Sequence, residues 1–518
     1  TLGFGDPLSL TLAADARLSS PDYSNDHIWE LELAGGEPAA LALRTTYGLR
    51  ARSMRLFPTF HENGKMATDP ASFAIPPLVT VFYANFLALR FFPFEDIEVT
   101  AEYWVPDSHS VSGRLTIINR TSTEREVDLD WCGKLSPLSG KNFFATKMQA
   151  VNVLVGSTGG LEPVVFLTGG PAAGIGPQPS LSLKLELGPG ARRQFTWAEA
   201  AFEEAAASFD AARQAAARPW DAERARIELT NASQTIDIQT GDAHWDAVFA
   251  LSQQNALRLF MGASESLPKP SFVSARQPDH GFSPKGDGSD HQPVWSGQSP
   301  MEASYLAGLL PGAQELGKGL LRNFLAVQSD DGAIDHRPGL AGQRGKLLAA
   351  PLLASLGWEL YQNNPDDEFL VEIYPALLKF FEIWFNPEND RNYDGIPEWG
   401  HPMQTGFEEH PLFGGWHNWS RGLDISTVHS PALMAMLYRE AKSLMEMAEI
   451  LGNRTDTTTL KNQADLLMKR TQKCWDTRLA GFRYRDRDSG LTQRGKILAS
   501  QRGSGTIKLK ESFAKPVR

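Results

Sequence analysis

The sequence has few cysteines, no long apolar run and no excess of positive charge. It contains 2 cysteines, Cys132 and Cys474, and neither forms a CxxC motif or a Cys/His pair, which argues against disulfide frameworks and zinc sites. No apolar run reaches the length of about 18 residues that a transmembrane helix requires. The net charge of −11 lacks the basic face that nucleic-acid binding requires. We therefore expect neither a membrane nor a nucleic acid as a partner.

Signals for targeting and for covalent catalysis are also missing. The chain opens with TLGFGDPLSL, which has no basic stretch followed by an apolar one. We expect a soluble protein of the cytoplasm, with secretion after removal of a signal as the alternative. No G-x-S-x-G motif occurs, and neither cysteine has a histidine close to it in the sequence. Nothing therefore indicates a Ser or Cys nucleophile, and we expect no organic cofactor.

The composition of 42% hydrophobic and 21% charged residues over 518 positions is that of a multidomain globular protein. Residues 1–195 contain short alternating segments such as DIEVTAEYWV and GRLTIINR, which predict an antiparallel β-sandwich. Residues 196–229 are rich in Ala, Glu and Arg at helical spacing and predict a helical linker. Residues 230–476 alternate helices with long loops, and residues 477–518 return to a strand-like pattern. Functional side chains concentrate on such ordered loops.

The segment 386–400, NPENDRNYDGIPEWG, places Asp or Asn on alternate residues before Gly395 and a Glu soon after it. Carboxylate, amide and carbonyl oxygens at this spacing are the ligands that Ca²⁺ prefers, and Gly395 permits the sharp turn. The alternative is a polar turn after a helix. We favour a structural Ca²⁺ ion, because such a set of oxygens leaves few positions open for catalysis. The predicted ligands are Asp390, Asn392, Asp394, the Ile396 carbonyl and Glu398.

The segment 416–431, WHNWSRGLDISTVHSP, places Asp424 in a loop rich in Gly and Trp before a well-capped helix. A carboxyl group packed against Trp416 and Trp419 would be desolvated, which raises its pKa and lets it act as a general acid. The alternative is that Asp424 caps the following turn or pairs with Arg421.

Two further loops, 268–302 and 328–343, are dense in polar and aromatic side chains. No clean pair of metal ligands occurs in either, so we expect substrate contacts there rather than a metal. The candidate substrate-binding residues, with those of the loop 398–424, are Trp295, Gln298, Asp335, His336, Gln343, Trp399, Trp416, Trp419 and Gly422.

The segments FLAVQSDDGAI, DRNYDGIPEWG, RGLDIS and LMAMLYREAKSLMEMAEILG resemble glycoside hydrolase family 63, which includes processing α-glucosidases and mannosylglycerate hydrolases. These are inverting glycosidases with an (α/α)6 barrel. The resemblance implies Asp424 as the general acid, and some members bind calcium in the matching loop. Ser420 and Arg421 depart from the family motif, as do 349–351 (AAP for QPP) and 295–299 (WSGQS for a W-D pair).

The resemblance implies a glycosidase that acts on an α-linked glucoside, mannoside or oligosaccharide with inversion. The helices predicted after residue 230 account for roughly half of a closed (α/α)6 ring, and the family's general base lies on a later helix. We therefore expect the general base to lie outside this chain. The chain alone would then be inactive, unless a further segment or chain completes the barrel. Glu408 and Glu409 match no motif. The alternatives are a glycoside phosphorylase, for which Arg276, His280 and Lys285 could bind phosphate, and a non-catalytic carbohydrate-binding protein.

Overall fold

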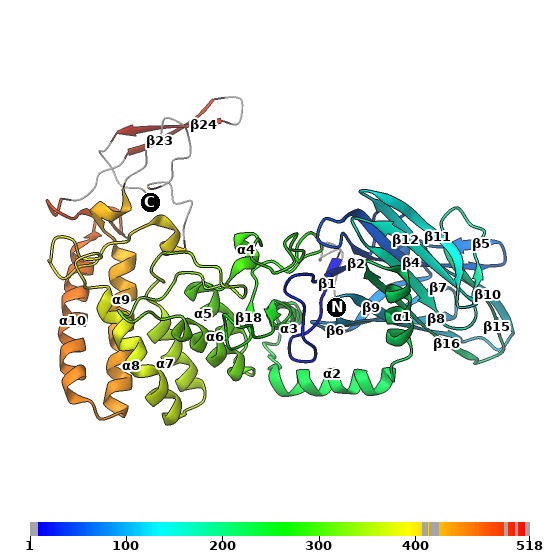
Figure 1. Cartoon of the computed structure of the whole chain (residues 1–518), viewed down its shortest axis with the longest axis horizontal. Helices are drawn as coiled ribbons and strands as arrows, with labels where there is room; N and C mark the ends of the chain where they lie inside the picture. Colours follow the sequence, from blue (N-terminus) through cyan, green and yellow to red (C-terminus); the bar gives the residue numbers. More distant parts are fainter. Residues whose placement is uncertain (1–8, 407–412, 414–423, 492–495, 503–505, 513–518) are drawn as a thin grey trace. The chain divides into compact units, whose positions relative to one another are not determined.

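The computed structural model describes residues 9–406, 413, 424–491, 496–502 and 506–512 (Figure 1). The predicted loop residues Glu408, Glu409, Trp416, Trp419 and Gly422 lie outside this described part of the chain. Residue contacts divide the chain into two units. The first consists of residues 1–265, 270–297 and 309–313, and the second of residues 266–269, 298–308 and 314–518. Among the described residues, no helix has both the length and the apolar character needed to cross a membrane.

The first unit contains two antiparallel sheets of eight strands each. In the first sheet the order is β1-β2-β3-β4-β10-β15-β14, with β5 paired to β4, and in the second it is β11-β12-β13-β16-β9-β8-β7-β6. The strands of the first sheet are β1 (Ser9–Leu12), β2 (Trp29–Glu32), β3 (Ala42–Thr45), β4 (Ala51–Glu62), β5 (Lys65–Ala67), β10 (Arg125–Pro137), β14 (Ala172–Ala173) and β15 (Ser180–Leu187). Those of the second are β6 (Ile75–Tyr83), β7 (Phe86–Phe94), β8 (Ile97–Asp107), β9 (Ser110–Asn119), β11 (Gly140–Met148), β12 (Val151–Thr158), β13 (Glu162–Leu167) and β16 (Arg192–Phe202).

The two sheets share one apolar core, as a sandwich requires. Trp131 of the first sheet stacks on Trp197 of the second with ring centroids 4.5 Å apart. Phe60 and Phe91 meet edge to face across the same interface at 6.0 Å. Along β15 the burial alternates between the two faces, which is the period-two pattern that the sequence shows.

Helices follow the last strand of the sandwich within the first unit. The helices are α1 (Ala205–Ala216), α2 (Trp220–Gln234), α3 (Ala243–Arg258) and the short α4 (Pro293–Ser296). Helix α3 is followed by β17 (Phe260–Met261), which pairs with β18 (Ser271–Phe272). A buried ion pair stabilises this unit: Arg276 Nε and Nη2 donate to Asp26 Oδ2 at 2.9 and 2.7 Å.

The second unit is mainly helical, and α7 packs against α6, α8 and α9, while α9 packs along α10 (Figure 1). Its helices are α5 (Pro300–Leu309), α6 (Gln314–Ala326), α7 (Leu353–Asn363), α8 (Asp367–Ile383), α9 (Pro431–Ile450) and α10 (Arg454–Lys473). This unit also contains two short 3-10 turns, Pro402–Thr405 and Ile425–Thr427. Its strand pairs are β19 (Val428–His429) with β22 (Arg485–Asp486), β20 (Trp475–Asp476) with β21 (Gly481–Phe482) and β23 (Lys496–Arg502) with β24 (Thr506–Ser512). The predicted fold class, a β-sandwich followed by helices, is confirmed.

The boundaries of α9 follow from local sequence signals. The Ser430 hydroxyl accepts a hydrogen bond from the Leu433 N–H at 3.3 Å, and Pro431 occupies the first helical position. At the other end Gly452 adopts a positive φ of 73°, which glycine adopts without strain. The predicted start and end of this helix are therefore confirmed. Its N-terminus directly follows His429 and the turn that begins at Asp424.

Candidate active site

The segment between α8 and the 3-10 turn at Pro402–Thr405 is folded around its own Asp side chains. Asp390 accepts hydrogen bonds from the backbone N–H groups of Asp394 (3.1 Å) and Gly395 (2.9 Å), one on each carboxylate oxygen. Asp394 Oδ1 accepts from the Ile396 N–H at 3.0 Å. Gly395 has a φ of +78°, so a side chain at this position would strain the turn. The alternating acidic pattern thus produces a compact loop that brings Glu398 back beside Asp390.

Glu398 and His429 form a buried pair beside this loop. The Glu398 side chain is 0% exposed, and His429 Nε2 lies 3.7 Å from both Glu398 Oε1 and Asp394 Oδ1. Glu398 Oε1 and His429 Nε2 have no hydrogen-bond partner among the described residues. Burial raises the pKa of Glu398 to about 7 and lowers the pKa of His429. Burial thus opposes the charged form of both side chains.

The structure brings three of the predicted calcium ligands close together. Asp390, Asn392 and Asp394 lie on one turn, since Asn392 Oδ1 approaches the Asp394 N–H at 3.4 Å. Within the described part of the chain, however, no three His, Cys, Asp or Glu side chains form a group that could hold a metal ion. The imidazole of His429 stands between the carboxylates of Asp394 and Glu398. The calcium site remains a prediction.

Asp424 is exposed and starts a 3-10 turn. Its Oδ1 accepts hydrogen bonds from the Ser426 N–H at 2.9 Å and from the Ser426 hydroxyl at 2.7 Å. These bonds favour the ionised carboxylate and lower the pKa of Asp424. The geometry is that of the capping alternative. The indoles on which the predicted rise in pKa depends, Trp416 and Trp419, lie outside the described residues.

Two arginines join the Asp424 turn to the acidic loop. Arg391 Nη1 and Arg487 Nη1 both donate to the Ser426 carbonyl, at 3.2 and 3.3 Å. Their charges lower the pKa of Asp424 further, after the hydrogen bonds from Ser426, and they oppose the effect of burial on Glu398. Two carboxyl groups in one cluster thus have pKa values moved in opposite directions, which is a common property of catalytic sites. Of the two carboxyl groups, Asp424 is the exposed one.

The loops after α6 and before α5 are fastened to each other. Arg337 Nη2 contacts both carboxylate oxygens of Glu302 at 2.8 Å. Asp335 accepts hydrogen bonds from the N–H groups of Gly345 (2.9 Å) and Lys346 (2.7 Å). Gln404 Nε2 donates to the Leu348 carbonyl at 2.9 Å, which ties in the segment after Trp399. Within the second unit these bonds join the start of α5 to the loop after α6, and the segment after Trp399 to Leu348.

Several predicted substrate contacts hold these loops in place. Gln298 is 0% exposed, and its Nε2 donates to the Leu320 carbonyl at 2.9 Å. His336 is buried, and its backbone N–H donates to the Leu347 carbonyl at 2.7 Å. Gln343 Oε1 accepts from the Ala341 N–H at 3.1 Å. These hydrogen bonds are internal to the protein, and the roles of the three residues in substrate binding stay predictions.

The two predicted tryptophans of the described part are buried rather than open platforms. Trp399 is 1% exposed and meets Trp384 edge to face at 5.6 Å. Trp295 belongs to the first unit, where its ring lies 5.1 Å from His291 and its carbonyl accepts from the Tyr23 hydroxyl at 2.6 Å. Arg276, considered above as a phosphate contact, is fully buried in its ion pair with Asp26. It offers no guanidinium to a ligand.

Sequence reasoning missed His429, Arg391 and Arg487 as members of the site. His429 precedes a recognisable helix start, but its distance to Asp394 is set by tertiary structure. Arg487 reaches the cluster because β22 pairs with β19, Val428 opposite Asp486. No spacing in the sequence indicates that pairing.

Residues 305–501 match the family model described as the mannosylglycerate hydrolase MGH1-like glycoside hydrolase domain. This match confirms the predicted family resemblance. The matched segment contains the acidic loop, Asp424 and His429. No curated protein matches the sequence.

Three solved structures are similar to this glycoside hydrolase-like chain at low identity. A GH63 mannosylglycerate hydrolase from Thermus thermophilus, in complex with glucose, shares 16% identity with a TM-score of 0.34 over 39% of this chain and 62% of that chain. A putative kojibiose phosphorylase from the human microbiome shares 9% sequence identity, with a TM-score of 0.42 over 92% of this chain and 64% of that chain. A bacterial glucoamylase complexed with acarbose shares 9% sequence identity, with a TM-score of 0.46 over 91% of this chain and 69% of that chain. The chain thus spans less than two thirds of the first two.

Proposed function

We propose that this chain is a glycosidase that cleaves an α-linked glucoside, mannoside or oligosaccharide with inversion, and that Asp424 protonates the leaving oxygen. The observation that carries the proposal is the match of residues 305–501 to a glycoside hydrolase domain. Within the matched segment, Asp424 is an exposed carboxyl, and Arg391 of the acidic loop bonds to the Ser426 carbonyl of its turn. The support for Asp424 is its place in the family motif and its exposure, whereas the hydrogen bonds from Ser426 lower its pKa and favour the ionised form.

Inversion also requires a base. A second carboxylate about 6.5–9.5 Å from the acid must activate a water molecule on the opposite face of the sugar. Glu398 is an unsuitable candidate because its side chain is fully buried. We assign no base among the described residues. The loops fastened by the Arg337–Glu302 pair and by Gln404 would form the walls of the sugar pocket.

Product analysis with and without inorganic phosphate tests this proposal. A hydrolase releases free sugar from an α-linked disaccharide whether or not phosphate is present. A phosphorylase would release a sugar 1-phosphate and would need phosphate. A carbohydrate-binding protein would bind the disaccharide and leave it intact. Either of these last two results would refute the proposed hydrolysis.

Replacing Ser426 with Ala is expected to change the pH profile of the reaction. The Ser426 hydroxyl stabilises the ionised form of Asp424, so its removal raises the pKa of that carboxyl. A general acid with a higher pKa stays protonated to higher pH, so the falling alkaline limb of kcat/KM should move to higher pH. The measurement is the pH dependence of kcat/KM for both proteins. As a control, Ser110→Ala removes the equivalent hydroxyl from Asp107 in the first unit and should leave the profile unchanged. An unchanged limb in Ser426→Ala would exclude Asp424 as the acid.

We also propose that the acidic loop binds a structural Ca²⁺ ion. The buried Glu398 Oε1 without a partner among the described residues supports this proposal. Binding would require the Asp394 and Glu398 carboxylates to turn from His429 toward the ion. Calcium should raise the melting temperature of the wild type and leave that of Asp394→Asn unchanged, as followed by thermal unfolding. Asp331→Asn, on a separate exposed loop, should keep the wild-type response. An equal response of all three proteins to calcium and to a chelator would rule out the site.

A further inference from the structure

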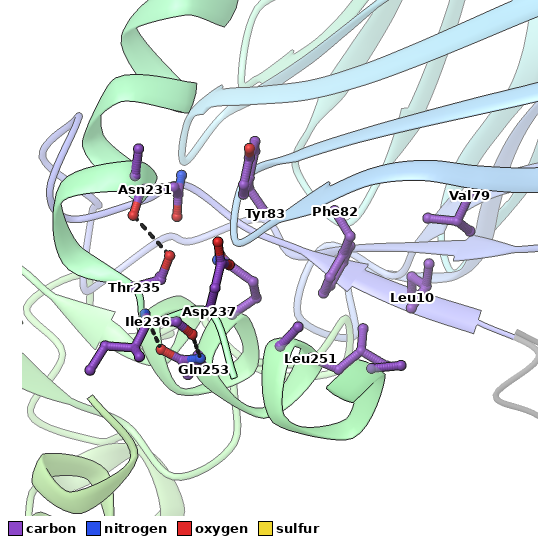
Figure 2. Close-up of a pocket in the computed structure, with 14 residues that line it drawn as sticks. Leu10, Val79, Phe82, Tyr83, Asn231, Thr235, Ile236, Asp237, Leu251 and Gln253 are labelled. Atoms are coloured by element: carbon purple, nitrogen blue, oxygen red, sulfur yellow. Dashed lines mark hydrogen bonds between the residues drawn. The ribbon is translucent and has the colours of Figure 1, made fainter. Parts of the chain in front are cut away.

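A cavity of about 420 Å³ lies in the first unit, remote in sequence from Asp424 (Figure 2). It is formed by the end of β6, the C-terminal part of α2 with the segment after it, and α3. Its volume falls within the range of about 300–1,000 Å³ that is typical of small-molecule sites. The residues that line it belong to a single unit, so its shape is set locally.

The cavity has an apolar side and a polar side. Figure 2 shows Leu10, Val79 and Leu251 on one side and Asn231, Thr235 and Asp237 on the other, with the rings of Phe82 and Tyr83 between them. Much of the polar side is internally bonded. Gln253, for example, donates to and accepts from the backbone of Ile236 at 2.8 and 2.9 Å. These bonds give the cavity a fixed wall.

Three polar groups of the cavity are left for a ligand. Gln254 is 6% exposed, and its side-chain carbonyl accepts from the Ala84 N–H at 3.2 Å. Its NH₂ group has no hydrogen-bond partner among the described residues and is not sealed from the cavity. The Tyr83 hydroxyl and the Asp237 carboxylate likewise make no hydrogen bond within the described part of the chain. An amide donor that faces the cavity without a protein partner is free to bond to an acceptor of a ligand.

The charges around the cavity exclude an anionic ligand. Asp237 and Glu228 both act on the Tyr83 hydroxyl, and Arg224, which faces the same group, is paired with Glu228 at 2.8 Å. A negative ligand would meet the Asp237 carboxylate, which has no ion-pair partner in the described part of the chain. A purely hydrocarbon ligand would leave the Gln254 NH₂ group unsatisfied.

We propose that this cavity is a second, non-catalytic binding site for a neutral saccharide of one or two sugar units. The apolar face of a sugar ring would pack on Phe82, as sugar rings pack on aromatic side chains, and a sugar hydroxyl would bond to the Tyr83 hydroxyl. Sugar hydroxyls would accept from Gln254 Nε2 and donate to Asp237. The inference follows from the chemistry of the cavity and holds whether or not the second unit hydrolyses glycosides.

Hydrogen–deuterium exchange on the whole chain with added maltose tests the site. Maltose should protect backbone amides at residues 75–84, 231–237 and 247–254 in proportion to its concentration. Tyr83→Phe removes only the hydroxyl, and Gln254→Glu keeps the acceptor for Ala84 while removing the NH₂ donor. Each variant should weaken this protection about tenfold, the effect of one lost hydrogen bond. Tyr361→Phe, at a half-buried tyrosine on α7 of the second unit, is the matched control and should bind as the wild type does.

The location of the protection separates this inference from the proposed hydrolase. Protection confined to the second unit would refute the inference and leave the catalytic proposal standing. The inference would also be refuted if Tyr83→Phe and Gln254→Glu both showed the same maltose protection in the three segments as the wild type. So would digalacturonate, a disaccharide with two carboxylates, if it protected these segments as well as maltose. Thermal unfolding of each variant confirms that it is folded before binding is compared.

Discussion

The variant Asp424→Asn is expected to lose roughly 100- to 10,000-fold in kcat/KM toward an α-glycoside, which is the usual contribution of a general acid. Asparagine keeps the Oδ1 acceptor for the Ser426 N–H and hydroxyl, so the turn that Asp424 starts should be preserved. The side chain nevertheless has no proton to give to the leaving oxygen. Steady-state kinetics measures the loss, and the melting temperature should stay close to that of the wild type.

Asp107→Asn is the matched control for this variant. Asp107 lies in the first unit and also accepts from a serine hydroxyl, that of Ser110, at 2.8 Å, and from a backbone N–H, that of His109, at 3.0 Å. The two substitutions therefore remove the same charge from the same kind of turn. Full activity in Asp107→Asn together with full activity in Asp424→Asn would eliminate Asp424 as the acid. Loss in both variants would show a general effect of charge.

The second large effect is expected at Glu440, which lies on α9 and is buried. Its carboxylate accepts from the N–H groups of Ala354 (2.8 Å) and Ser355 (2.7 Å) and from the Ser355 hydroxyl (2.6 Å). These groups belong to the first turn of α7, whose own N-cap residue, Leu352, provides no side-chain acceptor. Glu440→Ala should lower the free energy of unfolding by about 3 kcal/mol, because it leaves buried donors without a partner.

Urea denaturation followed by circular dichroism measures this loss. Glu449→Ala, at an exposed position of the same helix, is the control and should change stability by less than about 0.5 kcal/mol. Glu440→Gln should fall between the two, because one oxygen remains as an acceptor while the NH₂ group faces a donor. Equal stability of all three variants would mean that water satisfies the start of α7 unaided.

The fold was predictable where local chemistry determines it. The ends of α9 are specified by residues next to them in the sequence, Ser430 and Pro431 at the start and Gly452 at the end. The alternation of polar and apolar residues along β15 likewise specifies a half-buried strand. The role of Glu440 was not predictable, because its partner Ser355 is 85 residues away. A contact of that kind depends on how α7 and α9 pack.

The candidate site was predicted in part, for a similar reason. The turn at Asp390–Gly395 follows directly from alternating Asp and Asn side chains before a glycine. Loop composition suggested that Gln298 and Arg276 contact a ligand, but both are fully buried and hydrogen-bonded within the protein. The identity of a polar loop residue does not reveal whether its side chain faces solvent or supports the backbone. The position of His429 in the site results from tertiary packing, which no local sequence pattern indicates.

The most direct test of inverting hydrolysis is the configuration of the first sugar released from an α-linked disaccharide, followed by ¹H NMR before mutarotation. We expect the β-anomer to form first, at the same rate with and without phosphate, and Asp424→Asn to abolish the signal. Release of the α-anomer first would contradict inversion and with it the proposed mechanism.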